Sequence, residues 1–305
     1  MNTPECQPLP PGFPLAEYVI ERRLSQGGFS FVYLAREAGG KPVVVKEYLP
    51  AAMARRPAGQ VAPTVLPEWQ GKFNTGMMGF LDEAKLLAGI RHANVVRVLN
   101  FLKANGTAYL VMRYEAGQSL AQHLAALRQR GEGVSEDFLR GMFVRLLSGL
   151  REVHKQKLLH LDIKPANIYL RADGNPVLLD FGAARWGLEG DAALSKVCTP
   201  GYAAPEQHGS GEPWGPWTDI YAVGATLYAC LDGGRTPMPA PLRMAEDDLP
   251  PAQTLWEGHY SAQLLELIDW SLRLHVDTRP QSVYALQKVL NGELLDIVDP
   301  SWFER

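Results

Sequence analysis

The sequence has few cysteines and no long apolar run. Its 305 residues include three cysteines, Cys6, Cys198 and Cys230, which form no C-x-x-C pair. An odd and scattered set of this kind argues against a disulfide framework and favours free thiols in a reducing compartment. The longest apolar stretch, residues 220–231, is too short to span a bilayer.

The chain also has no excess of charge of either sign. With 30 basic against 33 acidic residues its formal charge is −3, which gives no reason to expect a nucleic acid or an anionic membrane surface as a partner. The first 18 residues contain no basic segment followed by an apolar one, so they do not resemble a signal peptide. These features predict a cytoplasmic protein with no membrane segment in this chain.

Two regions of different character follow each other along the chain. Segments rich in β-branched and aromatic residues are expected as strands: 18–34, 41–47, 95–102 and 107–114. One helix is expected in this region, at about 79–90. After Gly117 the pattern is mainly helical, and these helices are expected: 119–130, 135–155, 217–231, 261–274 and 281–290. The predicted fold is α+β and two-lobed, with a small antiparallel β lobe that carries one main helix and a larger helical lobe.

Lobe boundaries follow from these patterns. A proline-rich leader occupies residues 1–15, the small lobe 16–114, the large lobe 115–292, and a C-terminal tail 293–305. Within the small lobe, residues 48–78 form an insertion before the main helix, without clear secondary structure. A loop of this length is usually functional or disordered. It is either a regulatory or partner-binding element, or a passive flap packed on the small lobe through apolar side chains, which are Val61, Val65, Leu66 and Trp69.

Two features of the strand-rich region suit an anionic ligand. Residues 24–32, LSQGGFSFV, place small residues between two strands, where backbone N–H groups can approach phosphate oxygens. An ordinary hairpin turn is the alternative. Lys46 ends the apolar run 43–45 and would need an anionic partner if it were buried, for which Glu83 is the candidate. An exposed lysine on an edge strand is the alternative.

The clearest chemical pattern lies in the helical region. The run from His160 to Asn167, HLDIKPAN, precedes a short strand, and Asp180-Phe-Gly182 follows a second one. Carboxylate and amide oxygens at strand ends suit a divalent cation and proton acceptance. Lys164 adds positive charge where phosphate charge would move. Two surface turns are the alternative, although both patterns would rarely occur by chance in this order.

These motifs resemble those of the bacterial eukaryotic-type (Hanks-type) serine/threonine protein kinases, over about residues 18–290. The resemblance implies an enzyme that uses ATP and Mg²⁺, with Mn²⁺ as an alternative cation. It would transfer the γ-phosphoryl group to Ser or Thr hydroxyls of proteins, including itself, in bacterial signalling.

Site residues also follow from the resemblance. The implied catalytic residues are Asp162 as the base, Lys164, and Lys46 paired with Glu83. Nucleotide contacts are implied for Ser25, Gly27, Gly28, Ser30, Val32, Lys46, Met112, Tyr114 and Asn167. Asn167 and Asp180 would hold the cation. An activation segment is implied that includes Ser195, Thr199 and Glu206, the last paired with Arg279.

Further consequences concern the loop around Asp162. Asp219 is expected to anchor the backbone of this loop, and Thr199 is expected to hydrogen-bond near Asp162 and Lys164. Leu161 stands where many such kinases have arginine, so that no guanidinium is present there to receive an activation-loop phosphate. In the glycine-rich stretch, Ser25 and Ser30 replace glycines, which makes the loop stiffer and slightly bulkier.

Two other functions share parts of the pattern. A pseudokinase uses the same fold as a binding or scaffolding module, but usually lacks the strand lysine, the base or a metal ligand, all of which are present here. A small-molecule phosphotransferase typically lacks a peptide-positioning stretch, whereas Thr199-Pro-Gly-Tyr-Ala-Ala-Pro-Glu206 is complete. Lys164 followed by Pro165, together with Thr199, resembles Ser/Thr rather than Tyr kinases.

Overall fold

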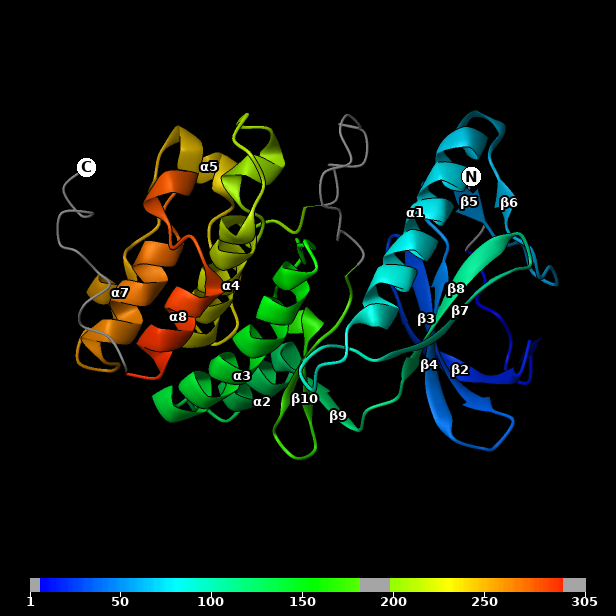
Figure 1. Ribbon diagram of the computed structural model, residues 1–305, viewed down its shortest axis with the longest axis horizontal. Helices are drawn as coiled ribbons and strands as arrows, with labels where there is room; N and C mark the ends of the chain where they lie inside the picture. The colour runs from blue at the N-terminus through cyan, green and yellow to red at the C-terminus, as the bar shows by residue number, and fades with distance from the viewer. Residues whose placement is uncertain (1–5, 182–197, 293–305) are drawn as a thin grey trace. The chain divides into compact units, whose positions relative to one another are not determined.

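The computed structural model describes residues 6–181 and 198–292. The chain divides into two compact units, of which unit 1 comprises residues 1–91 and 96–115, and unit 2 comprises residues 92–95 and 116–305. Unit 1 contains the long helix α1 and most of the strands, drawn in blue through cyan to blue-green in Figure 1, and unit 2 contains the other helices. Ser195, expected in the activation segment, lies outside the described residues.

Unit 1 is built on a six-stranded antiparallel sheet with the strand order β1-β2-β3-β4-β8-β7. Its strands are β1 (Pro14–Leu15), β2 (Tyr18–Gln26), β3 (Ser30–Glu37), β4 (Pro42–Tyr48), β7 (Val98–Ala104) and β8 (Thr107–Arg113). The hairpin predicted at Asn105-Gly106 is confirmed, since these two residues have φ of 51° and 72°. Positive φ at both central positions is what a tight two-residue hairpin turn requires.

Helix α1 (Gln70–Gly89) packs on one face of this sheet through buried Phe73, Met77 and Phe80. The predicted start at residue 79 is wrong, because the helix begins at residue 70. Each glycine in the first turns makes the helix less favourable by about 1 kcal/mol relative to alanine. The sequence pattern in these turns therefore does not indicate a helix. One of them, Gly76, is required by packing, since a Cβ there would overlap the Tyr48 hydroxyl.

The segment before α1 has more structure than the sequence predicts. Strands β5 (Ala54–Arg55) and β6 (Thr64–Val65) form a two-stranded sheet, and a 3-10 turn, η1 (Pro67–Trp69), leads into α1. The expectation that residues 48–78 lack secondary structure is therefore wrong. The apolar residues expected to pack are exposed or only half-buried, as with Val61 at 39% exposure, whereas Arg56 is 1% exposed. A buried polar side chain, rather than the apolar set, holds the segment to the sheet.

Unit 2 is mainly helical, as predicted. Its principal helices are α2 (Leu120–Gln129), α3 (Glu136–Lys155), α4 (Pro216–Leu231), α7 (Ala262–Ser271) and α8 (Val283–Leu290). The expected cap is confirmed at Ser135, whose hydroxyl accepts the backbone N–H of Phe138. Helix α3 packs on α8, and the almost wholly buried α4 packs on α7 (Figure 1).

Short elements position the polar loops of unit 2. A three-stranded sheet has the order β11-β10-β9, with β9 (Gly117–Ser119), β10 (Ile168–Arg171) and β11 (Pro176–Leu178). Two short helices, α5 (Ala240–Ala245) and α6 (Ala252–Trp256), were not predicted, because so few residues give no clear periodicity. Within the described part of the chain, no helix has both the length and the apolar character needed to cross a membrane.

Candidate active site

A buried carboxylate at the start of α4 fixes the loop that begins at His160. Asp219, which is fully buried, accepts the backbone N–H groups of His160 at 2.8 Å and Leu161 at 2.7 Å. Its carboxylate also lies 2.8 Å from His154 Nε2. Burial opposes ionisation of Asp219, but the hydrogen bond and charge of His154 and the backbone N–H groups outweigh it, so the pKa stays below its usual value. The predicted anchoring role of Asp219 is confirmed.

His160 connects this loop to the strand end before Asp180. Its Nε2 lies 2.9 Å from the carbonyl oxygen of Leu179, and its Nδ1 accepts the backbone N–H of Asp162 at 3.3 Å. A carbonyl oxygen only accepts, so Nε2 carries the proton and the ring is the neutral tautomer. The ring also packs on Phe181, with 4.4 Å between the ring centroids. The sequence contained His160 in a motif but did not indicate this role.

Leu161 is held in the left-handed backbone region, at a φ of 63°, and its side chain is buried. A branched residue in this conformation costs about 1–2 kcal/mol. Such strain is maintained by the surrounding contacts, here the Asp219 carboxylate and the Gln207 amide, which donates to the Leu161 carbonyl at 3.0 Å. The same Gln207 side chain accepts the Ala204 backbone N–H at 2.9 Å, so it joins two loops. Sequence reasoning missed Gln207, for which no local signal exists.

Four side chains of unit 2 form one hydrogen-bonded cluster around Asp162. Lys164 Nζ lies 2.9 Å and 2.8 Å from the two carboxylate oxygens of Asp162, and 2.6 Å from Thr199 Oγ1. The Thr199 hydroxyl donates to Asp162 Oδ1 at 2.6 Å. The Asn167 amide donates to Asp162 Oδ2 at 2.8 Å. The predicted hydrogen bonding of Thr199 near Asp162 and Lys164 is therefore confirmed.

Asn167 and Asp180 fit a divalent cation. The hairpin of β10 and β11 brings their backbones together, with the Leu179 N–H donating to the Asn167 carbonyl at 2.9 Å. The Asn167 amide nitrogen faces Asp162, so its side-chain oxygen points away, and Asp180 is exposed at a φ of 57°. An amide oxygen and a carboxylate are hard ligands of the kind that Mg²⁺ prefers.

A cation at this pair would need further ligands besides Asn167 and Asp180. Among residues 6–181 and 198–292, no three His, Cys, Asp or Glu side chains gather into a metal site. Mg²⁺ commonly keeps several waters or takes phosphate oxygens alongside one or two protein ligands. A two-residue donor set is therefore consistent with a cation that arrives together with a nucleotide.

A fully buried ion pair holds the segment that follows Thr199. The Arg279 guanidinium donates to both carboxylate oxygens of Glu206, at 2.8 Å and 3.0 Å, and both side chains are 0% exposed. Its other N–H groups bond the backbone carbonyls of Trp217, Arg273 and Leu274. The predicted partnership of Glu206 and Arg279 is confirmed.

In unit 1, Lys46 is buried at 8% exposure, so the alternative of an exposed edge-strand lysine is wrong. Its ammonium lies 6.0 Å from the ring centroid of Phe80 on α1. Glu83 follows Phe80 by three residues, which places both on the same side of the helix. Its pairing with Lys46 stays a prediction.

The other nucleotide-contacting candidates of unit 1 lie on or beside one face of the sheet. Val32 is opposite both Ser25 and Lys46 in the strand register, and Met112 is opposite Val44. Directly opposite residues share a face, as do alternate residues of one strand. Ser30 begins β3, and Tyr114 follows β8.

Gly27 and Gly28 form the connection between β2 and β3. A Cβ added at Gly28 would meet nothing within 4 Å, and one at Gly27 would meet only the Ser30 carbonyl oxygen, at 3.9 Å. Neither residue has the positive φ that favours glycine. The packing of the chain therefore does not require glycine at these two positions. Glycine would be required if an external group approached the backbone closely.

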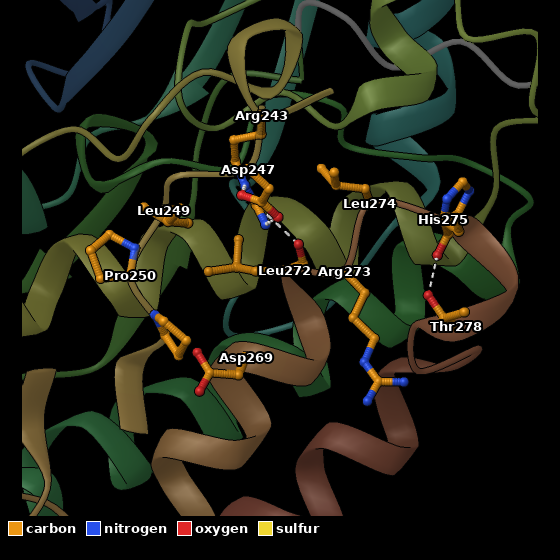
Figure 2. A pocket seen from close by; sticks show the side chains of 11 residues that line it. Arg243, Asp247, Leu249, Pro250, Asp269, Leu272, Arg273, Leu274, His275 and Thr278 are labelled. Carbon is orange, nitrogen blue, oxygen red and sulfur yellow. Dashed lines mark hydrogen bonds and ion pairs between the residues drawn. The ribbon is translucent and has the colours of Figure 1, made fainter. Parts of the chain in front are cut away.

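A separate cavity of about 410 Å³ lies in unit 2 and contains none of the predicted site residues (Figure 2). Several polar side chains that line it already have partners within the protein. Arg243 pairs with Asp247, and Asp269 accepts two backbone N–H groups. Arg243 also donates to the Tyr221 hydroxyl, and the Tyr221 ring lies 5.0 Å from the Arg279 guanidinium. The cavity thus adjoins the support of the Glu206 pair and not the Asp162 cluster.

An antiparallel sheet with one long helix, followed along the chain by a helical unit whose loops carry Asp162 and Asp180, is the arrangement of the protein-kinase fold. A model of the protein kinase domain matches residues 18–291. The chain is 33% identical over 222 residues to CBL-interacting protein kinase 4 of Oryza sativa subsp. japonica, covering 72% of this chain and 45% of that protein. It is 32% identical over 244 residues to PkwA of Thermomonospora curvata, a bacterial relative, covering 77% of this chain and 29% of that protein.

Solved structures agree with these matches. The structure titled PpkA-294 apo form has a TM-score of 0.81 and 32% identity, covering 93% of this chain and 99% of that one. The Mycobacterium tuberculosis PknI kinase domain, as a double mutant, shares the fold with a TM-score of 0.72 at 22% identity, covering 94% and 99%. The chain belongs to the protein kinase family. It spans less than half the length of the two curated relatives named above.

Proposed function

We propose that the chain is an ATP- and Mg²⁺-dependent serine/threonine protein kinase of the bacterial cytoplasm, which phosphorylates protein hydroxyls, including its own. The observation that carries this proposal is the cluster in which Lys164, Asn167 and Thr199 all contact the Asp162 carboxylate. Phosphoryl transfer depends mainly on positioning and on charge stabilisation, and this cluster provides both.

Each member of the cluster has a separate role in this proposal. Asp162 orients the attacking Ser or Thr hydroxyl and accepts its proton. Lys164 places a positive charge beside the γ-phosphoryl group during transfer. Thr199 hydrogen-bonds both Asp162 and Lys164 and so holds them in their relative positions. Asn167 and Asp180 would hold Mg²⁺ or Mn²⁺, which supplies positive charge to the phosphates when bound.

The residues of unit 1 bind the nucleotide in this proposal. Lys46, oriented by Glu83, contacts the α- and β-phosphates, and the loop from Ser25 to Ser30 covers them. Adenine contacts are assigned to Val32, Met112 and Tyr114. The open space around Gly27 and Gly28 supports the loop assignment, because a phosphate can approach the backbone there.

Phosphate transfer from labelled ATP tests the proposal against its two alternatives. We expect Mg²⁺-dependent label on the chain itself and on a generic basic protein, and none on sugars or aminoglycosides. Label on a small-molecule acceptor alone would identify a small-molecule phosphotransferase. Nucleotide binding without any transfer would identify a pseudokinase.

Thr199 is expected to act through its unmodified hydroxyl. Thr199→Ser keeps a hydroxyl between Asp162 and Lys164 and should retain activity. Thr199→Ala removes hydrogen bonds to two charged groups, and we expect a loss of kcat of about 10- to 100-fold. Steady-state kinetics on phosphatase-treated enzyme measure both variants. Because Leu161 offers no guanidinium for an activation-loop phosphate, an enzyme that works only after phosphorylation would contradict this prediction.

A regulatory partner is proposed for the segment 48–78, at its exposed turn over residues 57–62. This turn leads through β6 and η1 into the helix that carries Glu83, so a bound partner could shift the helix between two states. Replacing residues 57–60 with Gly and Ser at equal length keeps Val61, whose carbonyl accepts a hydrogen bond from Arg56, and should leave basal activity unchanged and remove the response to a partner. The measurement compares activity with and without host extract. An unaltered response would contradict the proposal.

A further inference from the structure

The face of the unit 1 sheet opposite α1 carries a buried ion pair directly beside Lys46. Consecutive residues of a strand point to opposite faces, so on β4 Lys46 lies on the Phe80 side and Glu47 on the other. Glu47 is 0% exposed, and its partner Arg56 is 1% exposed. Burying a charge is unfavourable unless it is paired and hydrogen-bonded, so this pair needs an explanation.

The Glu47 carboxylate is held by side chains from outside its own strand. The Arg56 guanidinium contacts both of its oxygens, and the Tyr33 hydroxyl donates to Oε2 at 2.8 Å. Tyr109 is directly opposite Glu47 in the strand register. Tyr33 and Tyr109 lie on β3 and β8, which flank β4. Burial, and then the charge of Glu47, raise the pKa of both tyrosines, so both hydroxyls remain donors.

Arg56 is itself oriented by backbone groups on either side. Its Nε donates to the Val61 carbonyl at 2.8 Å, and its Nη1 donates to the Gln7 carbonyl at 3.2 Å. The Gln7 N–H returns a hydrogen bond to the Arg56 carbonyl at 3.0 Å. A planar guanidinium with donors in fixed directions can make all of these contacts together, which an ammonium cannot.

Residues 49–56, which we call the positioning segment, also hold the glycine-rich loop. The Leu49 N–H donates to the Phe29 carbonyl at 2.9 Å, and the Ala51 N–H donates to the Gly28 carbonyl at 2.8 Å. These bonds continue the ladder of β3 and β4 beyond the pair of Ser30 and Tyr48. One end of the segment therefore fixes the loop, and the other end carries Arg56.

We propose that the Glu47–Arg56 pair is a positioning device for the phosphate-binding elements of unit 1. It fixes β4, and hence Lys46, and through the positioning segment it fixes the loop at Gly27 and Gly28. The inference rests on the proposed function, in which Lys46 and this loop contact the phosphates of ATP. A buried ion pair is seldom more stabilising than apolar residues of similar size, so its directional geometry is the more informative property.

Arg56→Lys tests the pair, because it keeps the charge and removes the bidentate fork. We expect the Kd for the magnesium complex of the non-hydrolysable ATP analogue AMP-PNP to rise about tenfold, with unchanged binding stoichiometry. Isothermal titration calorimetry measures both quantities. The matched control is Arg36→Lys, on the exposed pair of Arg36 and Glu21 in the same sheet, where no change is expected.

A merely stabilising role gives a different result. Partial unfolding lowers the stoichiometry and leaves the Kd unchanged, and that outcome overturns the proposal. Glu47→Gln with Arg56→Met removes both charges, so it avoids an unpaired buried charge and should give the same rise in Kd in a folded protein. If neither variant folds, the pair is a folding requirement and the positioning role is rejected. A wild-type chain that binds AMP-PNP but transfers no phosphate would refute the kinase assignment. It would not refute the positioning role, because the Kd values of wild type and variants can still be compared.

Discussion

Asp162→Asn should lower phosphoryl transfer by about 10³-fold while leaving the fold and nucleotide binding intact, because a correctly placed general base contributes on the order of 10²–10⁴-fold. Asparagine has nearly the same shape and retains one side-chain oxygen. It cannot accept the substrate proton, and it loses the ion pair with Lys164. The rate of transfer from labelled ATP, thermal melting and binding of AMP-PNP with Mg²⁺ measure the three properties separately.

Asp180→Asn should show a similar loss of transfer, through weaker cation binding. Asp173→Asn is the control, because Asp173 lies in the turn of the same hairpin and its exposed carboxylate is hydrogen-bonded by Asn175. We expect this control to keep full activity.

An Asp162→Asn enzyme that retains activity within about tenfold of wild type would contradict the assignment of the base.

Arg279→Met should cause the largest loss of stability among the variants considered. It leaves the Glu206 carboxylate buried without its partner, and it removes donors from three backbone carbonyls. Breaking a buried ion pair from one side costs about 3–5 kcal/mol. For a unit of this size we expect the melting temperature to fall by about 10 °C. Thermal or urea-induced unfolding, followed by circular dichroism, measures the change.

The double variant Arg279→Met with Glu206→Leu separates charge burial from the loss of contacts. It removes the orphaned carboxylate, so it should recover part of the lost stability. Arg235→Met is the control, since Arg235 pairs with Asp232 at the surface and should change stability by less than about 1 kcal/mol. A single variant Arg279→Met as stable as this control would show that the buried pair contributes little.

Local sequence signals were sufficient to predict several elements. Asn105-Gly106 specified a hairpin, since positive φ at both positions is readily adopted there. Ser135 specified the start of α3, because a hydroxyl at this position satisfies an unpaired N–H in the first turn. The run from His160 to Asn167 and the Asp180 motif indicated the family, and the β10–β11 hairpin brings the backbones next to Asn167 and Asp180 together.

Other features depend on contacts between residues that are distant in sequence, and only the folded chain shows them. The start of α1 at residue 70 follows from burial of Phe73 and Met77 on the sheet, which outweighs the low helix propensity of the nearby glycines. Gln207 reaches Leu161 across 46 positions, and no local pattern marks such a contact. From the sequence alone, Arg56 would be expected at the surface, in a proline-rich loop. Only the folded sheet shows that Arg56 is the partner of Glu47. A charged side chain can be buried there because the Glu47 carboxylate and two backbone carbonyls hydrogen-bond it.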